Sequence, residues 1–253
     1  MAEHRFHTPE PVEIEIKVPV GDVDVETIDG EESLITVEGT EKMLDQLIVE
    51  QQGRRIVVEL RGKKPFGVTI MIGDLTWGSG GRLRVRARVP HGSQAFLATA
   101  AADMKLRGRI RSLDSKSASG DLVVTGEIER DATVKTVSGD VRLERVGGEL
   151  RFTTVSGDVL VRSVARSVEG KAVSGDVRLE STREGTVTVQ SVSGDIEVGV
   201  EAGTNLDVDA GSVSGDLSSE VPLGSEPGET EDAGPTLVLR GKTVSGDFRV
   251  FRA

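Results

Sequence analysis

The sequence contains no cysteine, no tyrosine and a single tryptophan among its 253 residues. Without cysteine the chain can form no disulfide framework, no thiolate metal site and no cysteine nucleophile. Aromatic residues make up only 3% of the chain, although a compact globular core usually relies on their bulk. The apolar residues are mainly valine, with leucine, isoleucine and alanine, and this composition suits thin, regular β-structure.

Basic residues are also in deficit, with 31 Lys and Arg against 42 Asp and Glu, which gives a formal net charge of −11. This balance argues against nucleic acid as a partner, because a phosphate polymer would be repelled. The N-terminus lacks the apolar segment of a signal peptide, and no apolar run approaches the ~18 residues of a membrane span. We therefore expect a cytoplasmic protein with no transmembrane segment.

What the sequence does contain is one motif, Ser-Gly-Asp, usually preceded by valine, in seven copies. The spacings between successive Asp residues are 19, 18, 18, 19, 21 and 31. A nearly fixed period of this kind is typical of a repeat architecture. The copies are Ser119, Gly120, Asp121; Ser138, Gly139, Asp140; Ser156, Gly157, Asp158; Ser174, Gly175, Asp176; Ser193, Gly194, Asp195; Ser214, Gly215, Asp216; and Ser245, Gly246, Asp247.

Each repeat unit alternates apolar and polar residues, as half-buried strands do. After Asp140, for example, Val141 and Leu143 alternate with Arg142 and Glu144. The valine before the motif forms a further apolar column, which we also expect to fill the core. Its members are Val137, Val155, Val173, Val192, Val213 and Val244.

The period also reaches upstream of the first complete motif. Asp103 lies 18 residues before Asp121 and begins a unit that lacks Ser-Gly, and Gly21-Asp22-Val23 is a degenerate copy. Each unit is too short to bury its own apolar face, so the units must stack. Two topologies fit, a parallel β-solenoid with one coil per unit and an antiparallel meander with two strands per unit. The meander would need a sheet of more than about ten uncovered strands.

We therefore predict an all-β fold, a parallel β-solenoid of 18–19-residue coils, with right-handed coiling favoured by the crossover rule. Residues 1–90 are predicted to form an N-terminal β-strand region that caps one end, and residues 91–253 the solenoid. Between Glu41 and Gln52 helix and strand compete, and we favour two antiparallel strands joined at Gln52-Gly53. We expect Phe248 and Phe251 near the opposite end.

Two segments interrupt the period. Residues 62–81 are rich in apolar side chains, include Trp77 and have glycine-rich ends, so they could form a partner-docking or membrane-touching flap. The favoured alternative is a strand or loop that caps the end of the core. Residues 219–236 are acidic and rich in Pro and Gly, and are predicted to be a loop ejected from the last coil.

The Asp column allows two interpretations. Stacked carboxylates could hold Ca²⁺ between coils. The favoured alternative is structural: glycine relieves a sharp corner, while the Ser and Asp side chains bond the amides of their own turn. We therefore predict no metal and no cofactor.

Two rows of arginines form a candidate anion-binding stripe, with Arg84, Arg86 and Arg88 on one strand and Arg107 and Arg109 on another. The favoured alternative is pairing with acidic strand faces such as Glu13-Glu15 or Asp22-Asp24-Glu26. His4, His7 and His91 lack metal-ligand spacing, and no nucleophile elbow, phosphate-binding loop or zinc signature occurs. We therefore predict no enzymatic activity.

The Val-Ser-Gly-Asp repeats resemble a widespread bacterial family whose members are named putative adhesins or β-strand-repeat proteins of unknown function. The segments Phe6–Val12, Arg84–Ser93 and Thr243–Phe248 are similar to its actinobacterial branch. The resemblance covers nearly the whole chain, implies a β-solenoid-like fold and carries over no catalytic residue.

These observations predict a non-enzymatic binding or scaffolding module that contacts an unknown protein or surface partner along its coil faces. A second hypothesis is a bactofilin-like scaffold that self-associates through the open ends of the solenoid. A carbohydrate-active β-helix enzyme is a third and weaker one, because a chain without tyrosine has few aromatic platforms for sugars.

Overall fold

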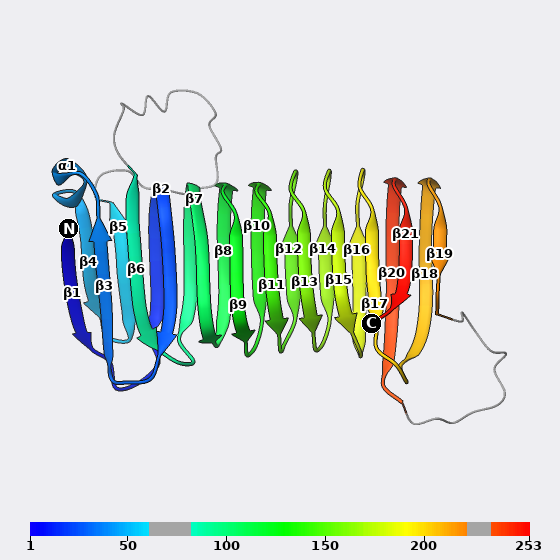
Figure 1. Cartoon of the computed structure of the whole chain (residues 1–253), viewed down its shortest axis with the longest axis horizontal. Helices are drawn as coiled ribbons and strands as arrows, with labels where there is room; N and C mark the ends of the chain where they lie inside the picture. Colours follow the sequence, from blue (N-terminus) through cyan, green and yellow to red (C-terminus); the bar gives the residue numbers. More distant parts are fainter. Residues whose placement is uncertain (61–81, 222–233) are drawn as a thin grey trace.

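The computed structural model describes residues 1–60, 82–221 and 234–253. The chain forms a stack of coils, in which the strands of successive coils pair side by side along the long axis of the molecule (Figure 1). Strands of neighbouring repeat units pair in parallel, as β10 does with β12, which excludes the meander. The predicted all-β solenoid is therefore confirmed. We call each coil a rung; most rungs contribute one strand to each of two opposite walls.

The first wall contains the strand that precedes each Ser-Gly-Asp corner. In spatial order its strands are β4 (Leu47–Gln52), β5 (Arg55–Leu60), the first part of β2 (Glu13–Ile28), the first part of β7 (Gln94–Ile110), β8 (Ser112–Ser119), β10 (Ala132–Ser138), β12 (Leu150–Thr153), β14 (Val168–Lys171), β16 (Gly185–Gln190), β20 (Thr236–Ser245) and β18 (Asn205–Ser214).

The second wall contains the strand that follows each corner. In spatial order its strands are β1 (Ala2–His7), β3 (Glu32–Glu38), β6 (Leu83–Pro90), the second part of β2, the second part of β7, β9 (Leu122–Ile128), β11 (Val141–Val146), β13 (Val159–Val164), β15 (Val177–Thr182), β17 (Ile196–Val200), β21 (Phe248–Arg252) and β19 (Leu217–Ser219).

The N-terminal end of the stack is closed by antiparallel elements. β1 pairs with β3, β3 with β6, and β4 with β5, all antiparallel, so the predicted hairpin at Gln52-Gly53 is confirmed. A short helix, α1 (Glu41–Leu44), precedes this hairpin. Parallel stacking already begins at β2, where Asp22 is aligned with Asp103, so both upstream copies of the repeat are rungs. The boundary between a cap and a solenoid domain at residue 90 stays a prediction.

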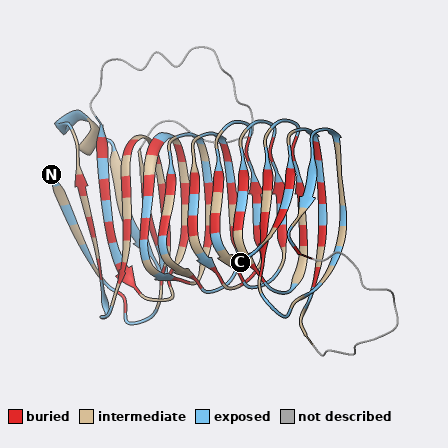
Figure 2. Ribbon diagram, turned by 45° about the vertical axis from the view of Figure 1, so that its right-hand side comes forward, coloured by how far each residue is buried: buried red, intermediate tan, exposed pale blue. Residues whose placement is uncertain are grey.

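A single apolar core fills the space between the walls. Buried and exposed residues alternate along the strands (Figure 2), and Val141, Leu143, Leu150 and Phe152 are all buried, as the alternation predicted. Burying a Val, Leu or Phe side chain stabilises a fold by about 1.5–3 kcal/mol relative to its exposure. Because neighbouring rungs supply the same residue types at the same positions, this gain repeats from rung to rung.

The prediction that the valine before each Ser-Gly-Asp motif fills the core is wrong. These valines are exposed, from 39% at Val137 to 82% at Val213, whereas the residue before each valine is generally buried. The reason is strand alternation, which continues to the corner: Phe152 points in, Thr153 out, Thr154 in and Val155 out. The buried corner column consists of the small residues Thr136, Thr154, Ala172, Ser191 and Thr243.

The order of the last two rungs in space is the reverse of their order in the sequence. β20 lies between β16 and β18, and β21 lies between β17 and β19, so the C-terminal rung is inserted into the stack (Figure 1). Phe248 and Phe251 therefore lie near this end, as expected, but one rung inside the terminal one. Phe248 is 1% exposed, and Phe251 lies below the guanidinium of Arg178, 5.3 Å from it.

Side-chain bulk explains this insertion. The inward residues of the C-terminal rung include Leu239, Phe248 and Val250, and the aligned residues of the other rung are the smaller Val208, Leu217 and Ser219. An inner rung is covered on both sides and a terminal rung on one, so more apolar area is buried when the bulkier rung lies inside. The terminal strand β18 also exposes two aspartates, Asp207 and Asp209, which suit an edge strand.

The inverted order can be tested with engineered disulfides, because the chain has no cysteine of its own. Ser193 is bridged to Ser245, and Ser245 is aligned with Ser214, so Ser193 and Ser214 are two rungs apart. Parallel strands lie about 4.8 Å apart, within the Cα separation that a disulfide spans. We expect Ser193→Cys/Ser245→Cys to cross-link on oxidation and Ser193→Cys/Ser214→Cys not to. Non-reducing electrophoresis distinguishes the cross-linked from the uncross-linked variant. Cross-linking of the Ser193/Ser214 pair alone would show that the last two rungs stack in the order of the sequence.

Candidate functional site: the Ser-Gly-Asp edge

The Ser-Gly-Asp corners lie one above another along a single edge of the solenoid. Serines of successive rungs form parallel bridges, from Ser138 through Ser156 and Ser174 to Ser193 and Ser245. From Ser156 onward, the N–H of each of these serines donates a hydrogen bond of 2.7–2.9 Å to the carbonyl oxygen of the valine in the preceding rung. Each residue of the motif therefore forms a continuous row along this edge.

The Asp row is a ladder of hydrogen bonds between rungs. The N–H of each motif aspartate donates to Oδ1 of the aspartate in the preceding rung at 2.8–3.1 Å, from Asp121 to Asp103 at one end and from Asp216 to Asp247 at the other. The expectation that these carboxylates bond the amides of their own turn is therefore wrong. The acceptor belongs to the neighbouring rung because the stack brings that amide within reach.

Glycine is required at these corners for two reasons. Gly157 has φ +137°, a conformation that side-chain-bearing residues rarely adopt, and a Cβ placed on it would lie 2.3 Å from the carbonyl oxygen of Gly139. The glycines of neighbouring rungs therefore approach each other through backbone atoms alone. This close approach positions each Asp N–H near the carboxylate of the rung before it.

Outside this hydrogen-bonded edge lies a row of exposed valines, which we call the valine ridge. In spatial order it consists of Val137, Val155, Val173, Val192, Val244 and Val213. The backbone bonds of the serine bridges hold these side chains at one rung spacing, about 4.8 Å. The ridge is therefore an ordered apolar surface with the polar Ser and Asp rows beside it.

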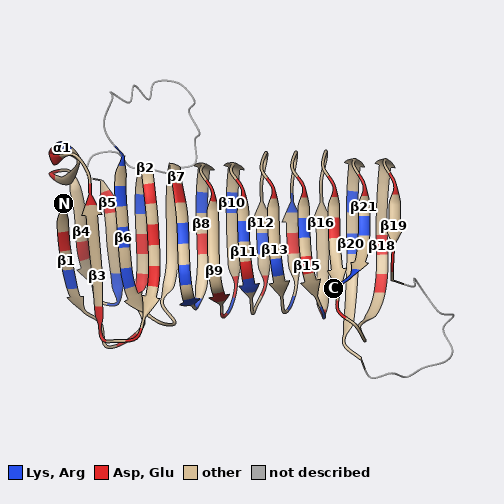
Figure 3. Cartoon of the chain, in the orientation of Figure 1, with Lys and Arg blue, Asp and Glu red and all other residues tan. Residues whose placement is uncertain are grey.

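The arginine rows do not form an open basic stripe. Strand β2 runs between β6, with Arg84, Arg86 and Arg88, and the second part of β7, with Arg107 and Arg109. Acidic and basic residues therefore face each other across these strands (Figure 3). The ion pairs are Arg84–Asp22 at 3.6 Å, Arg86–Glu38 at 3.2 Å, Arg88–Glu26 at 3.3 Å and Arg107–Asp24 at 3.3 Å.

The favoured pairing with the Asp22-Asp24-Glu26 face is thus present, and Glu38 of β3 joins it. Glu15 instead pairs with Lys17 and Arg55. Arg109 makes no ion pair within the part of the chain that the structure describes. Its backbone N–H donates to Oγ1 of Thr27 at 2.8 Å. Trp77 and all of residues 62–81 lie outside the described residues, as does most of the predicted loop at 219–236.

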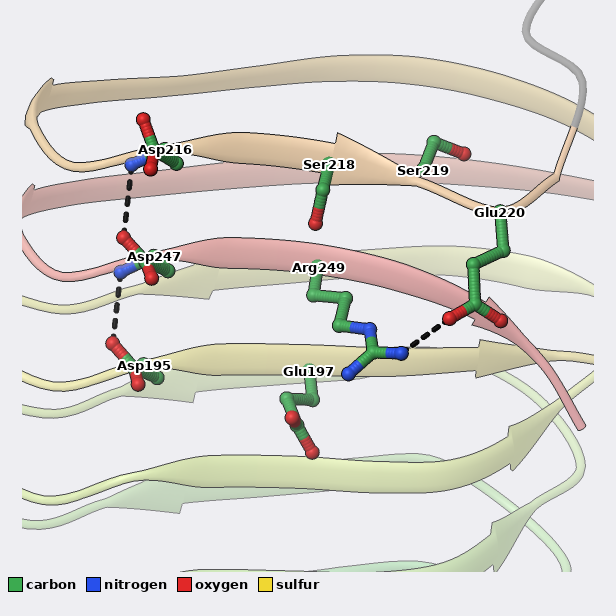
Figure 4. A pocket seen from close by; sticks show the side chains of 8 residues that line it. All are labelled: Asp195, Glu197, Asp216, Ser218, Ser219, Glu220, Asp247 and Arg249. Carbon is green, nitrogen blue, oxygen red and sulfur yellow. Dashed lines mark hydrogen bonds and ion pairs between the residues drawn. The ribbon is translucent and has the colours of Figure 1, made fainter.

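A shallow depression of about 500 Å³ lies over the last three rungs of the second wall, and sequence reasoning missed it. Asp195, Glu197, Asp216, Glu220 and Asp247 line it together with Arg249 and two serines (Figure 4). Arg249 donates to Glu220, and this hydrogen bond, with the carboxylate charge, raises the pKa of Arg249 above its ordinary value. The sequence pattern did not reveal this depression because the rungs that meet here are not consecutive in the sequence.

Within residues 1–60, 82–221 and 234–253, no three His, Cys, Asp or Glu side chains are grouped so that they could hold a metal ion. In the Asp row one carboxylate oxygen of Asp103, Asp121, Asp140, Asp158, Asp176, Asp195 and Asp247 already accepts a backbone amide. No helix in the described part of the chain is long and apolar enough to cross a membrane.

Comparison with known proteins agrees with this architecture. The model of the Toastrack DUF4097 family matches residues 13–250, and the chain belongs to this family. No curated protein sequence matches the chain. Among solved structures it is similar to a putative adhesin from Bacteroides fragilis, with TM-score 0.57 and 12% identity over 98% of this chain and 96% of that one.

It is also similar to a putative lipid binding protein from Parabacteroides distasonis, with TM-score 0.61 and 14% identity over 98% of this chain and 96% of that one. At these identities the likeness shows the shared fold. The predicted resemblance to a bacterial family of putative adhesins is confirmed.

The close approach of the corner glycines predicts an unusually costly substitution. We expect Gly157→Ala to lower stability by clearly more than Gly30→Ala, a matched control with φ +136° and nothing within 4 Å of its added Cβ. The backbone strain alone costs about 1–3 kcal/mol at either site, and the contact with Gly139 adds to it only in Gly157→Ala. Urea unfolding midpoints measure the difference, and equal losses would show that the contact is relieved without cost.

The Asp ladder predicts that stability depends on the carboxylate oxygen as a hydrogen-bond acceptor more than on its negative charge. Asp158→Ala removes the acceptor of the exposed Asp176 N–H and should cost about 0.5–1.5 kcal/mol, whereas Asp158→Asn keeps an oxygen there and should cost less than half as much. Thermal unfolding gives the stabilities, and hydrogen exchange should be faster at the Asp176 amide in Asp158→Ala alone. An Asn variant as unstable as the Ala variant would instead make the charge decisive.

Proposed function

We propose that this protein is a non-enzymatic binding module and that the valine ridge is its principal contact surface for a protein partner. The observation that carries the proposal is the exposure of six aligned valines that lie outside the buried core. Contiguous exposed apolar surface on a soluble fold commonly marks an interaction site. Strand geometry alone does not require valine beside the corner, because Thr would fit the same backbone and its hydroxyl group would be hydrated.

The shape of the edge favours an extended macromolecular partner. The ridge runs across six rungs without an enclosing cavity, whereas small-molecule sites are concave and bury most of their ligand. The exposed Ser and Asp rows beside the valines offer hydrogen-bonding groups at the same spacing, so a partner can make polar and apolar contacts together. The negative Asp row also disfavours nucleic acid and anionic lipid surfaces as the partner.

A binding role agrees with the names of the structural neighbours, a putative adhesin and a putative lipid binding protein. The predicted absence of enzymatic activity is supported by the same neighbours. A location in the cytoplasm stays a prediction from the sequence.

The triple variant Val155→Thr/Val173→Thr/Val192→Thr tests the ridge. The change keeps a β-branched side chain of similar shape, so the unfolding free energy should shift by less than about 1 kcal/mol while the apolar surface is lost. The matched control is Val123→Thr/Val238→Thr, two outward-facing valines outside the ridge. Tagged wild type and both variants are used as bait in lysate of the native host, and the captured proteins are quantified.

We expect at least one protein to be captured about equally by wild type and control and at least tenfold less by the ridge variant. Equal capture by all three baits would overturn the ridge as the contact surface. Binding of the wild type to phosphatidylcholine vesicles that is lost in the ridge variant, with no protein captured, would assign the ridge to lipid instead.

A further inference from the structure

Among residues 1–60, 82–221 and 234–253, nothing covers the C-terminal end of the stack. In this part of the chain strands β18 and β19 each pair on one side only, with β20 and β21 respectively. Leu217 of β19 is 54% exposed, although it occupies the core column of the buried Phe248 beside it. A hollow of about 180 Å³ opens at this end, lined by Val208, Ala210, Leu217, Phe248 and Val250 with two serines.

The opposite end of the solenoid is built differently. There Phe6, Met43, Leu44, Leu47 and Val49 pack over the core from β1, α1 and β4. Solenoids need such terminal caps because an uncovered rung exposes apolar core and unpaired strand edges. By this comparison, the described residues provide a cap at the N-terminal end and leave the C-terminal end ready to accept a strand.

The hydrogen-bonding groups at this end are arranged for one more rung. In the inner corners from Gly139 onward the glycine N–H donates to the serine carbonyl of the next rung, as from Gly246 to Ser214, and the Asp carboxylate accepts from the next rung. The corresponding groups of the terminal rung, the Gly215 N–H and the Asp216 carboxylate, make no hydrogen bond within the described residues. An added strand would therefore find donors and acceptors already in register.

Charge determines which kind of strand fits. Asp207 and Asp209 are exposed on β18, and Asp216 and Glu220 flank β19. Two cations lie beside these carboxylates: Arg249 is paired with Glu220, and Arg240 of β20 is aligned with Asp209, so the carboxylates at this end still outnumber the cations. A second copy meeting this end through a two-fold axis would bring β18 against β18 and carboxylates against carboxylates, on a chain with net charge −11. A strand that carries Lys or Arg meets the opposite charge.

We propose that β18 binds an extended, basic segment of a partner protein as an additional strand. Its apolar side chains cover Leu206, Val208 and Leu217, while alternate Lys or Arg side chains lie beside Asp207 and Asp209. The backbone hydrogen bonds of β-strand addition provide affinity, and this alternation provides specificity. Val213 is the one ridge residue on β18, so the site adjoins the last residue of the valine ridge and extends the proposed function to a second surface at the end of the stack.

A synthetic peptide of ten residues with alternating Val and Lys serves as the probe, and the same peptide with Glu in place of Lys is the control. Binding to the full-length protein is measured by fluorescence anisotropy at low and at physiological salt. We expect saturable binding of the basic peptide, weaker at higher salt, and at least tenfold weaker binding of the acidic one.

Two variants locate the site. Asp207→Asn/Asp209→Asn should weaken the basic peptide about tenfold, and Leu217→Lys should weaken it further because a cation then lies over the hollow. The charge-matched control Asp114→Asn/Glu169→Gln changes two carboxylates of the same wall, on β8 and β14, and should bind as wild type does. The ridge variant Val155→Thr/Val173→Thr/Val192→Thr should also bind normally, which separates this site from the ridge.

The proposal is overturned if the basic peptide fails to bind saturably, if the acidic peptide binds equally well, or if the Asp207/Asp209 variant binds like wild type. Analytical ultracentrifugation provides a further check. A wild-type dimer that dissociates in Leu217→Lys would assign this end to a second copy of the chain, whereas a monomer leaves it free for the basic strand.

Discussion

Each rung of this solenoid is joined to the next by a backbone amide that donates to an aspartate carboxylate. The interaction depends on the glycine beside it, because only bare backbone can approach the neighbouring glycine carbonyl as closely as Gly157 approaches Gly139. Together they let the chain turn sharply while the Asp N–H keeps a hydrogen bond, an interaction that contributes about 0.5–1.5 kcal/mol at each of these exposed corners. The alignment of the walls, the core columns and the valine ridge all depend on this corner.

The two surfaces proposed for binding differ in how the fold produces them. The valine ridge follows from repetition: one outward residue per rung, copied along the edge, becomes an extended apolar surface. The open end follows from the interruption of repetition, because the last rung has nothing to cover it among the described residues. One surface is apolar along its length and the other combines an apolar hollow with carboxylates, so they are suited to different partners.

Much of this fold could be predicted from the sequence, because the period and the alternation of apolar residues directly reflect stacking and burial. The valine column was misplaced although the same alternation, followed from Phe152 to Val155, points it outward. The pairing of the arginines with acidic strand faces could be predicted. Glu38 could not be named as a partner, because it comes from a strand far away in the sequence. The order of the last rungs was not predictable from the motif, since all rungs share the same corner and can pair with one another.

The insertion of the C-terminal rung has a consequence for how the molecule is made. During synthesis, residues 205–219 emerge before residues 236–252, yet their native neighbour is that later segment. The rung at 205–219 can pair temporarily with β16 and β17, because its corner is compatible with theirs, and it must then separate before the final segment enters. A chain that lacks residues 236–252 therefore has an alternative pairing available, and the entry of this later segment decides the final arrangement.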